Sequence, residues 1–135
     1  MVGLKKTFGF TLAVLIVLGW TYASVEKKNI DKDRAWEIVK KKILPKDLEG
    51  KIIYVSIDLL KAGQSIKSWG HDYKVPENFP QSWFFFVDDQ PDANWGHACR
   101  YIFVDAGTGK YAVIKASTPP DSMDRMKKIF PLPLP

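Results

Sequence analysis

The apolar positions that follow residue 30 first recur at a helical spacing. Four of them lie three or four residues apart and share one face of a helix: Ala35, Ile38, Val39 and Ile43. Asp31 is a typical N-cap, and Pro45 cannot continue a helix. The pattern predicts an amphipathic helix between these two residues, with its apolar face on a core.

After residue 50 the apolar pattern changes to a period of two, which is typical of a strand with one buried face. Three further runs read as strands. The four predicted strands are residues 51–60, 83–87, 99–105 and 111–116, and the glycine-bearing segment 106–110 is a hairpin loop. One helix followed by antiparallel strands predicts an α+β fold, with an N-terminal helix packed on a curled antiparallel sheet of about four strands.

Two segments lack a clear period. Residues 61–82 contain two glycines and two prolines, so they predict a long loop. After the predicted domain (31–117), Asp121 can cap a short helix in which Met123, Met126 and Phe130 share a face. The last five residues alternate proline and leucine and can only be extended. We therefore expect residues 118–135 to form a short helix and a proline-rich tail.

The start of the chain has the pattern of an export signal. Lys5 and Lys6 precede an apolar stretch from Thr7 to Trp20, and Ala23 is a small residue at the position that a signal peptidase reads. Residues 1–23 are therefore predicted to be a signal peptide, followed by a linker at 24–30. The alternative is an uncleaved membrane anchor. In both cases we expect the domain outside the cytoplasm, as a secreted or periplasmic bacterial protein.

Composition narrows the function classes. Cleavage would leave 112 of 135 residues and lower the net charge from +5 to +3, because Lys5 and Lys6 would be removed. A chain of this size holds one core and is too short for a large multidomain enzyme, and the remaining charge does not favour a nucleic-acid partner. Cys99 is the only cysteine, so no internal disulfide can form and packing must supply the stability.

Two segments resemble PepSY-type domains, the small exported modules found with secreted peptidases and in cell envelopes. One is the capped, alanine-centred helix start at 31–39, and the other is the strand, turn and returning strand at 101–111, with its Asp-Ala-Gly-Thr-Gly-Lys turn. The long loop, residues 83–99 and the proline-rich end depart from that pattern. The resemblance implies a PepSY or cystatin-like layout, an inhibitory or chaperoning role towards a peptidase or binding in the cell envelope, and no catalytic residues.

Catalytic and metal motifs are weak in this sequence. His97 and Cys99 are two residues apart, as a thiolate–imidazole pair on a strand would require, but no orienting Asn or Asp is evident from the spacing. His71, His97, Cys99 and the nearby acids lack the paired close spacing of a structural zinc site, and the acidic segment 88–94 lacks the central glycine and terminal glutamate of a calcium loop. We therefore expect no enzymatic activity, no cofactor and no metal.

Aromatic residues carry the strongest functional signal. Ten lie between residues 69 and 103, and the predicted strand at 83–87 has rings on both faces, whereas one helix can cover only one face. Either the long loop covers the other face, or the rings form an exposed binding patch. Trp69 and Trp95 adjoin glycines in polar loops. The predicted contact residues are Trp69, Tyr73, Trp95, His97 and Arg100.

These observations predict a non-enzymatic binding module that contacts a protein partner, such as a peptidase, through an aromatic loop and a sheet surface. Two alternatives remain open. One is a glycan-binding module in which exposed tryptophans stack on sugar rings. The other is a thiol or metal site at His97 and Cys99. Tryptophan fluorescence and thiol reactivity would separate the three hypotheses.

Overall fold

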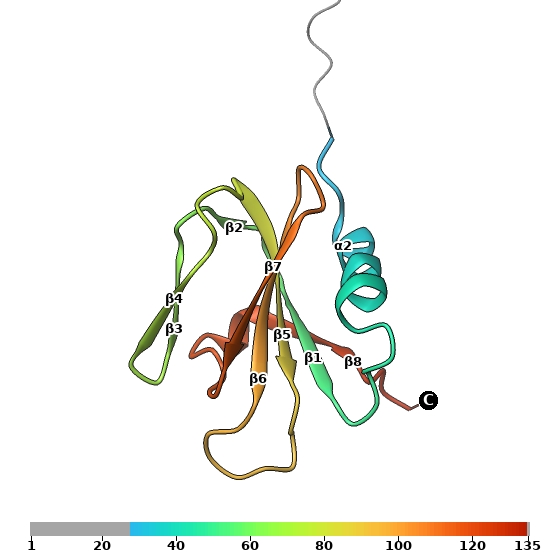
Figure 1. Cartoon of the computed structure of the whole chain (residues 1–135), viewed down its shortest axis with the longest axis vertical. Helices are drawn as coiled ribbons and strands as arrows, with labels where there is room; N and C mark the ends of the chain where they lie inside the picture. The colour runs from blue at the N-terminus through green and yellow to red at the C-terminus, as the bar shows by residue number, and fades with distance from the viewer. Residues whose placement is uncertain (1–27, 135) are drawn as a thin grey trace, which may run out of the picture.

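A computed structural model describes residues 28–134 of the chain (Figure 1). The predicted signal peptide and most of the predicted linker lie outside the described residues. Within residues 28–134, no helix is long and apolar enough to cross a bilayer.

The N-terminal helix begins with α2 (Lys32–Ile38) and continues as a π-helical turn, η1 (Val39–Ile43). Asp31 caps it, since its Oδ1 accepts a hydrogen bond of 2.8 Å from the Arg34 amide. In the wider turn the Leu44 amide donates to the Val39 carbonyl, five residues back, at 2.9 Å. Val39 and Leu44 are both buried there, so the turn places both side chains in the core.

Over residues 28–134 the main sheet has six antiparallel strands, and a separate hairpin has two. The hairpin consists of β3 (Ser65–Ser68) and β4 (His71–Lys74). The main-sheet strands are β1 (Ile52–Ser56), β2 (Leu60–Lys61), β5 (Gln81–Asp88), β6 (Cys99–Asp105), β7 (Tyr111–Ala116) and β8 (Met126–Phe130). The order across the sheet is β7-β6-β5-β1-β8, and β2 pairs with one end of β5. The predicted fold of about four strands is therefore wrong.

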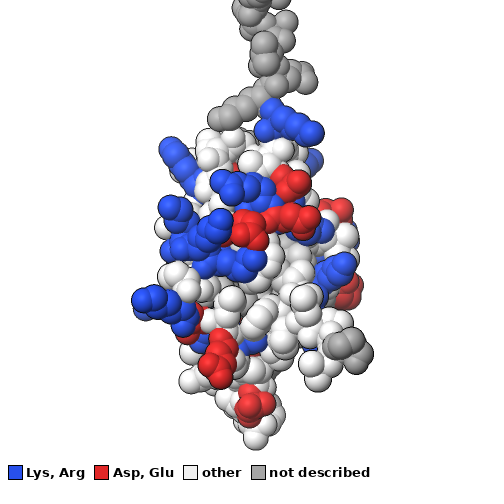
Figure 2. Space-filling view, turned by 90° about the vertical axis from the view of Figure 1, so that its right-hand side faces the viewer, with Lys and Arg blue, Asp and Glu red and all other residues white. Residues whose placement is uncertain are grey.

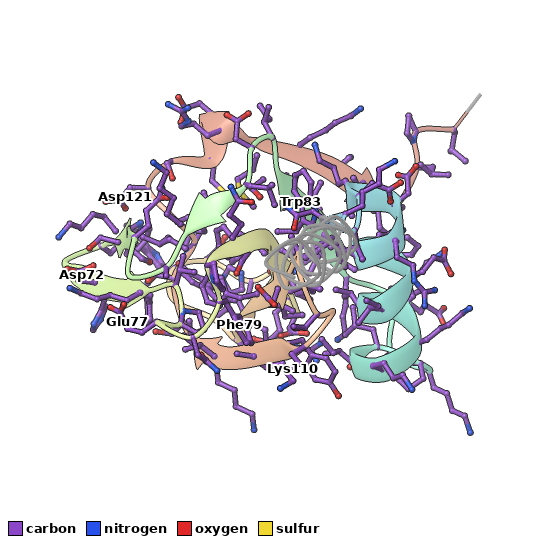
Figure 3. The ribbon with its side chains drawn as sticks, turned by 90° about the horizontal axis from the view of Figure 1, so that it is seen from above. Asp72, Glu77, Phe79, Trp83, Lys110 and Asp121 are labelled. Atoms are coloured by element: carbon purple, nitrogen blue, oxygen red, sulfur yellow. The ribbon has the colours of Figure 1, made fainter. Side chains whose placement is uncertain are left out.

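Two cores lie on opposite faces of this sheet. On one face α2 packs against β1, β5 and β6, and the Trp36 ring stacks on Phe85 with centroids 6.1 Å apart. On the other face the β3–β4 hairpin and the segment after it cover the rings of Phe84 and Phe86. Phe79 of that segment belongs to this second core, whereas Trp83 packs in the core beside α2 (both labelled in Figure 3). Each buried ring contributes about 1.5–3 kcal/mol relative to exposure.

The hairpin corrects the prediction that residues 61–82 form a long loop without regular structure. Gly63 and Gly70 have φ values of 73° and 86°, in the region that glycine adopts without strain, and each lets the chain reverse direction. Ser65–Ser68 then alternates exposed and buried residues, so the strand period is present but very short. The hairpin also covers the second face of β5, so the aromatic rings on that face do not form an exposed patch.

The predicted C-terminal helix is also wrong. Met123–Arg125 forms only a single 3-10 turn, η2, and the chain then enters β8. The helical spacing of Met126 and Phe130 is outweighed by pairing with β1, whose edge would otherwise carry open backbone groups. A short isolated helix is too weak to compete with such a ladder.

Candidate functional site

Trp69 occupies the tip of the β3–β4 hairpin. Ser68 pairs with His71, so Trp69 and Gly70 form a two-residue loop, and both have positive φ (44° and 86°). Type I′ turns have this property and favour Asn-Gly, because a bulky L-residue is strained at positive φ. Trp69 is nevertheless there, and 57% of its surface is exposed.

Trp95 is the second exposed tryptophan, on the loop that joins β5 to β6. Its φ is 64° and 83% of its surface is exposed. His97 holds this loop, since its Nδ1 lies 2.7 Å from the Trp95 carbonyl oxygen and its Nε2 lies 2.8 Å from Asp88 Oδ1. These contacts, first the Trp95 carbonyl and then Asp88, raise the pKa of His97 above its usual value. A protonated His97 donates both hydrogen bonds, so the ring anchors the Trp95 backbone.

The segment from Ser117 to Asp121 connects the two tips. The His97 amide donates to the Ser117 carbonyl at 2.9 Å, and the Trp69 amide donates to Asp121 Oδ1 at 3.1 Å. Asp121 lies on the same side of the molecule as Asp72 of β4 (Figure 3). Both tryptophan loops are therefore tied to the same five residues of the chain.

Buried hydroxyl groups hold the middle of this segment. Ser68 Oγ lies 2.7 Å from the Pro119 carbonyl oxygen, and the Tyr101 hydroxyl donates to the Thr118 carbonyl at 2.8 Å. These contacts hold both tryptophan loops against the same short segment of the chain. We call Trp69, Trp95 and the segment Ser117–Asp121 between them the tryptophan surface. In Figure 1 the β3–β4 tip, the end of β7 and the β5–β6 loop lie along the same lower part of the molecule.

Two of the predicted contact residues make contacts within the fold. Tyr73 is half-buried, and its ring packs on Tyr101 with centroids 4.7 Å apart. Arg100 makes a two-pronged contact with Asp89, at 3.1 Å and 2.6 Å, and a further contact of 3.3 Å with Asp47. Arg100 therefore joins the β5–β6 loop to the segment after the helix.

The structure places Cys99 and His97 in separate hydrogen-bond environments. Cys99 is only 2% exposed, and its Sγ donates to the Thr118 carbonyl at 3.5 Å. Burial raises the pKa of its thiol to about 11. The His97 ring is committed to Trp95 and Asp88, so it does not activate this thiol. Among residues 28–134, no cluster of three or more His, Cys, Asp or Glu could hold a metal ion.

Charge is spread over the helical side of the molecule. Lys and Arg gather over α2 and the turn after it, but acidic side chains lie among them (Figure 2). Glu37, for example, forms ion pairs with Lys40 at 2.6 Å and Lys41 at 3.8 Å. This face therefore does not present the uniform positive charge that a phosphate backbone requires.

Sequence reasoning found the two tryptophans but missed the residues that position them: Ser68, Thr118 and Asp121. Ser68 and Thr118 are both buried, and the Ser68 hydroxyl donates a hydrogen bond to the Thr118 carbonyl although the two residues are 50 positions apart in the sequence. The only local signal was the alternating pattern of β3, which makes Ser68 an inward-facing residue.

Comparison with protein families, with characterised proteins and with solved structures gives no match to this chain. The resemblance to PepSY-type domains therefore stays a prediction.

Proposed function

We propose that this protein is an exported, non-enzymatic binding module that contacts a protein partner through the tryptophan surface. One observation carries the proposal. Among the described residues, the two non-glycine residues with positive φ are Trp69 and Trp95; both are exposed, and both of their loops are hydrogen-bonded to the segment Ser117–Asp121. Strained backbone persists only where the surroundings hold it, and it concentrates at functional sites.

The chemistry of the surface suits a protein partner. Tryptophan is enriched among residues that dominate protein interfaces, because its large ring buries much apolar area. Here the backbone of each ring is already fixed by hydrogen bonds to His97 or Asp121, so less conformational entropy is lost on binding. A peptidase, the partner class that the PepSY resemblance implies, would be bound by insertion of these two rings and thereby occluded.

The proposed contact is narrower than the sequence predicted. The rings of β5 are covered by α2 on one face and by the β3–β4 hairpin on the other, so the sheet does not offer an aromatic patch. Arg100 and Tyr73 make contacts within the fold. The proposal therefore rests on Trp69 and Trp95, with His97 as the residue that positions Trp95.

The test is affinity capture from the extracellular or periplasmic fraction of the source organism. The wild-type chain should recover a defined protein, identified by mass spectrometry, and both Trp69→Ala and Trp95→Ala should reduce its recovery at least tenfold. Ile57→Ala is the matched control, because Ile57 is half exposed but lies outside the tryptophan surface. Equal recovery by all four chains would contradict the proposal.

A glycan ligand is the alternative outcome. Sugar rings that stack on Trp69 and Trp95 would quench or shift tryptophan fluorescence when cell-wall polysaccharide is titrated in. A protein-specific surface gives no such change at saturating polysaccharide. If polysaccharide alters the fluorescence of the wild type but not of the Trp69→Ala, Trp95→Ala double variant, the partner class proposed here is wrong.

Export is the part of the proposal that rests on residues 1–23 alone. Intact mass of the chain recovered from a bacterial periplasm or medium should correspond to residues 24–135. A chain that keeps all 135 residues in the cytoplasm would contradict export.

A further inference from the structure

The two edges of the main sheet differ in how well they are protected. At the β8 edge the pairing with β1 is interrupted by a register shift, Lys127 and Lys128 are exposed, and Pro131 follows the strand. Bulges, charged residues and prolines are the usual devices that keep an edge strand from pairing with another chain. The β8 edge is therefore blocked.

The opposite edge, β7, has no bulge and no proline, and exposed Lys115 is its one charged residue. Its six residues pair with β6 in an unbroken register, and no other described strand pairs with its outer side. Tyr111 and Val113 remain 44% and 41% exposed. In Figure 3 the strand that begins after Lys110 runs along the outside of the molecule. The edge is thus regular, open and apolar except at Lys115.

The hydrogen-bond pattern of β7 identifies which backbone groups are free. The Asp105 amide donates to the Lys110 carbonyl at 2.8 Å, and in an antiparallel ladder hydrogen-bonded pairs alternate with non-bonded pairs. Ala112, Ile114 and Ala116 therefore direct their backbone groups towards β6. The outward groups belong to three alternate residues: Tyr111, Val113 and Lys115.

We propose that β7 pairs antiparallel with β7 of a second copy of this chain, with Val113 opposite Val113 and Tyr111 opposite Lys115. Other registers that keep corresponding faces of the two sheets on the same side would pair fewer residues. This register pairs all three outward-facing residues of each strand. It would form six hydrogen bonds, since each of the three bonded pairs exchanges two. The paired sheets would form one continuous sheet across the dimer.

The side chains suit this register. Lys115 faces Tyr111 of the second copy, where its charge can lie over the ring, and no residue of β7 faces a like charge. The two Val113 side chains meet at the symmetry axis and shield each other from water. Three residues a strand are far fewer than the roughly 20–30 residues a side of a standard interface, so the dimer should be weak.

The wild-type full chain provides the first test. Sedimentation from about 10 μM to about 1 mM, the range in which weak complexes dissociate, should show a shift from monomer to dimer. Over the same range the Tyr111, Val113 and Lys115 amides should gain protection from hydrogen exchange, while those of Met126–Phe130 should not change. A monomer throughout, a dimer that leaves the three amides unprotected, or protection that does not depend on concentration would each overturn the proposal.

Charge variants test the register. Because Val113 faces itself, Val113→Glu and Val113→Lys should each weaken the dimer at least tenfold, and an equimolar mixture should restore it as a heterodimer. Tyr111→Glu should still dimerise, because the new carboxylate faces Lys115. Homodimers of both Val113 variants, or a mixture that stays monomeric although circular dichroism shows both chains folded, would refute this register.

This proposal is independent of the tryptophan surface. Trp69→Ala and Trp95→Ala should dimerise as the wild type does, so loss of partner capture and loss of dimerisation are distinguishable.

Discussion

Trp69 and Trp95 both have positive φ, so we expect the backbone at these two exposed residues to be strained. Substitutions that differ in their tolerance of positive φ test this. The perturbation is a pair of substitutions at each position, Trp95→Asn with Trp95→Ala, and Trp69→Asn with Trp69→Ala. Both members of a pair remove the ring completely, so the loss of ring packing is the same for each. They differ mainly in how well the new residue tolerates a left-handed backbone.

The expected magnitude follows from the backbone geometry. Left-handed conformation costs an ordinary L-residue about 1–2 kcal/mol, and asparagine relieves much of this cost through local hydrogen bonding. Because φ is 64° at Trp95 and 44° at Trp69, the free energy of unfolding of each Asn variant should exceed that of the matching Ala variant by about 1 kcal/mol. For a domain of about 100 residues this corresponds to roughly 4–8 °C in Tm.

Urea denaturation followed by circular dichroism measures these differences, and calorimetry gives the Tm values. Ile57 is the control, because it is exposed and does not have positive φ; there the Asn variant should be no more stable than the Ala variant. Equal stabilities within both tryptophan pairs would refute the inference that the backbone at these residues is strained.

Four further outcomes follow from the contacts around the site. The pKa of His97 is raised in the folded protein, so protonated His97 stabilises the fold at pH values below its unfolded pKa of about 6.5. This stabilisation is lost as the pH rises through the folded pKa. His97→Gln should therefore remove this pH-dependent loss from the free energy of unfolding. Cys99 should resist iodoacetamide at pH 8 until denaturant is added, and rapid labelling of the native chain would show that its thiol is not buried. Tyr101→Phe should lower the unfolding free energy by about 1 kcal/mol in urea, through loss of the bond to Thr118. Arg100→Lys should lower the melting temperature, because lysine keeps the charge but cannot make the two-pronged contact with Asp89, and an unchanged melting temperature would contradict this role.

The helix and three of the four predicted strands could be located from sequence because local chemistry specifies them, whereas the predicted strand 51–60 is two strands, β1 (Ile52–Ser56) and β2 (Leu60–Lys61). Asp31 caps the helix and Pro45 follows its end, and the strand cores at 83–87, 99–105 and 111–116 were placed where the structure has them. The sheet was nevertheless wrong in size. Met126–Phe130 becomes a strand only because β1 offers a free edge, and no local pattern contains that information.

The candidate site likewise combines residues that local sequence indicates with contacts that only the fold creates. Trp69 and Trp95 stood out as tryptophans beside glycines in polar loops, which is a local signal. That both loops lie against one segment of the chain depends on hydrogen bonds from the Ser117–Asp121 segment to Ser68, Trp69 and His97, across 20 to 52 positions of sequence. The assignment of Arg100 to the contact surface was an inference from its sequence neighbourhood. Asp89 and Asp47, brought beside it by the fold, give it a structural role that the sequence could not show.

The central claim is that Trp69 and Trp95 together contact a protein partner. Site-specific photo-crosslinking tests it most directly, with benzoylphenylalanine placed in turn at residues 69, 95, 57 and 128 of the exported chain. Positions 69 and 95 should crosslink to the same protein, and positions 57 and 128 should not. Crosslinks to different proteins, or crosslinks of equal yield from all four positions, would contradict it.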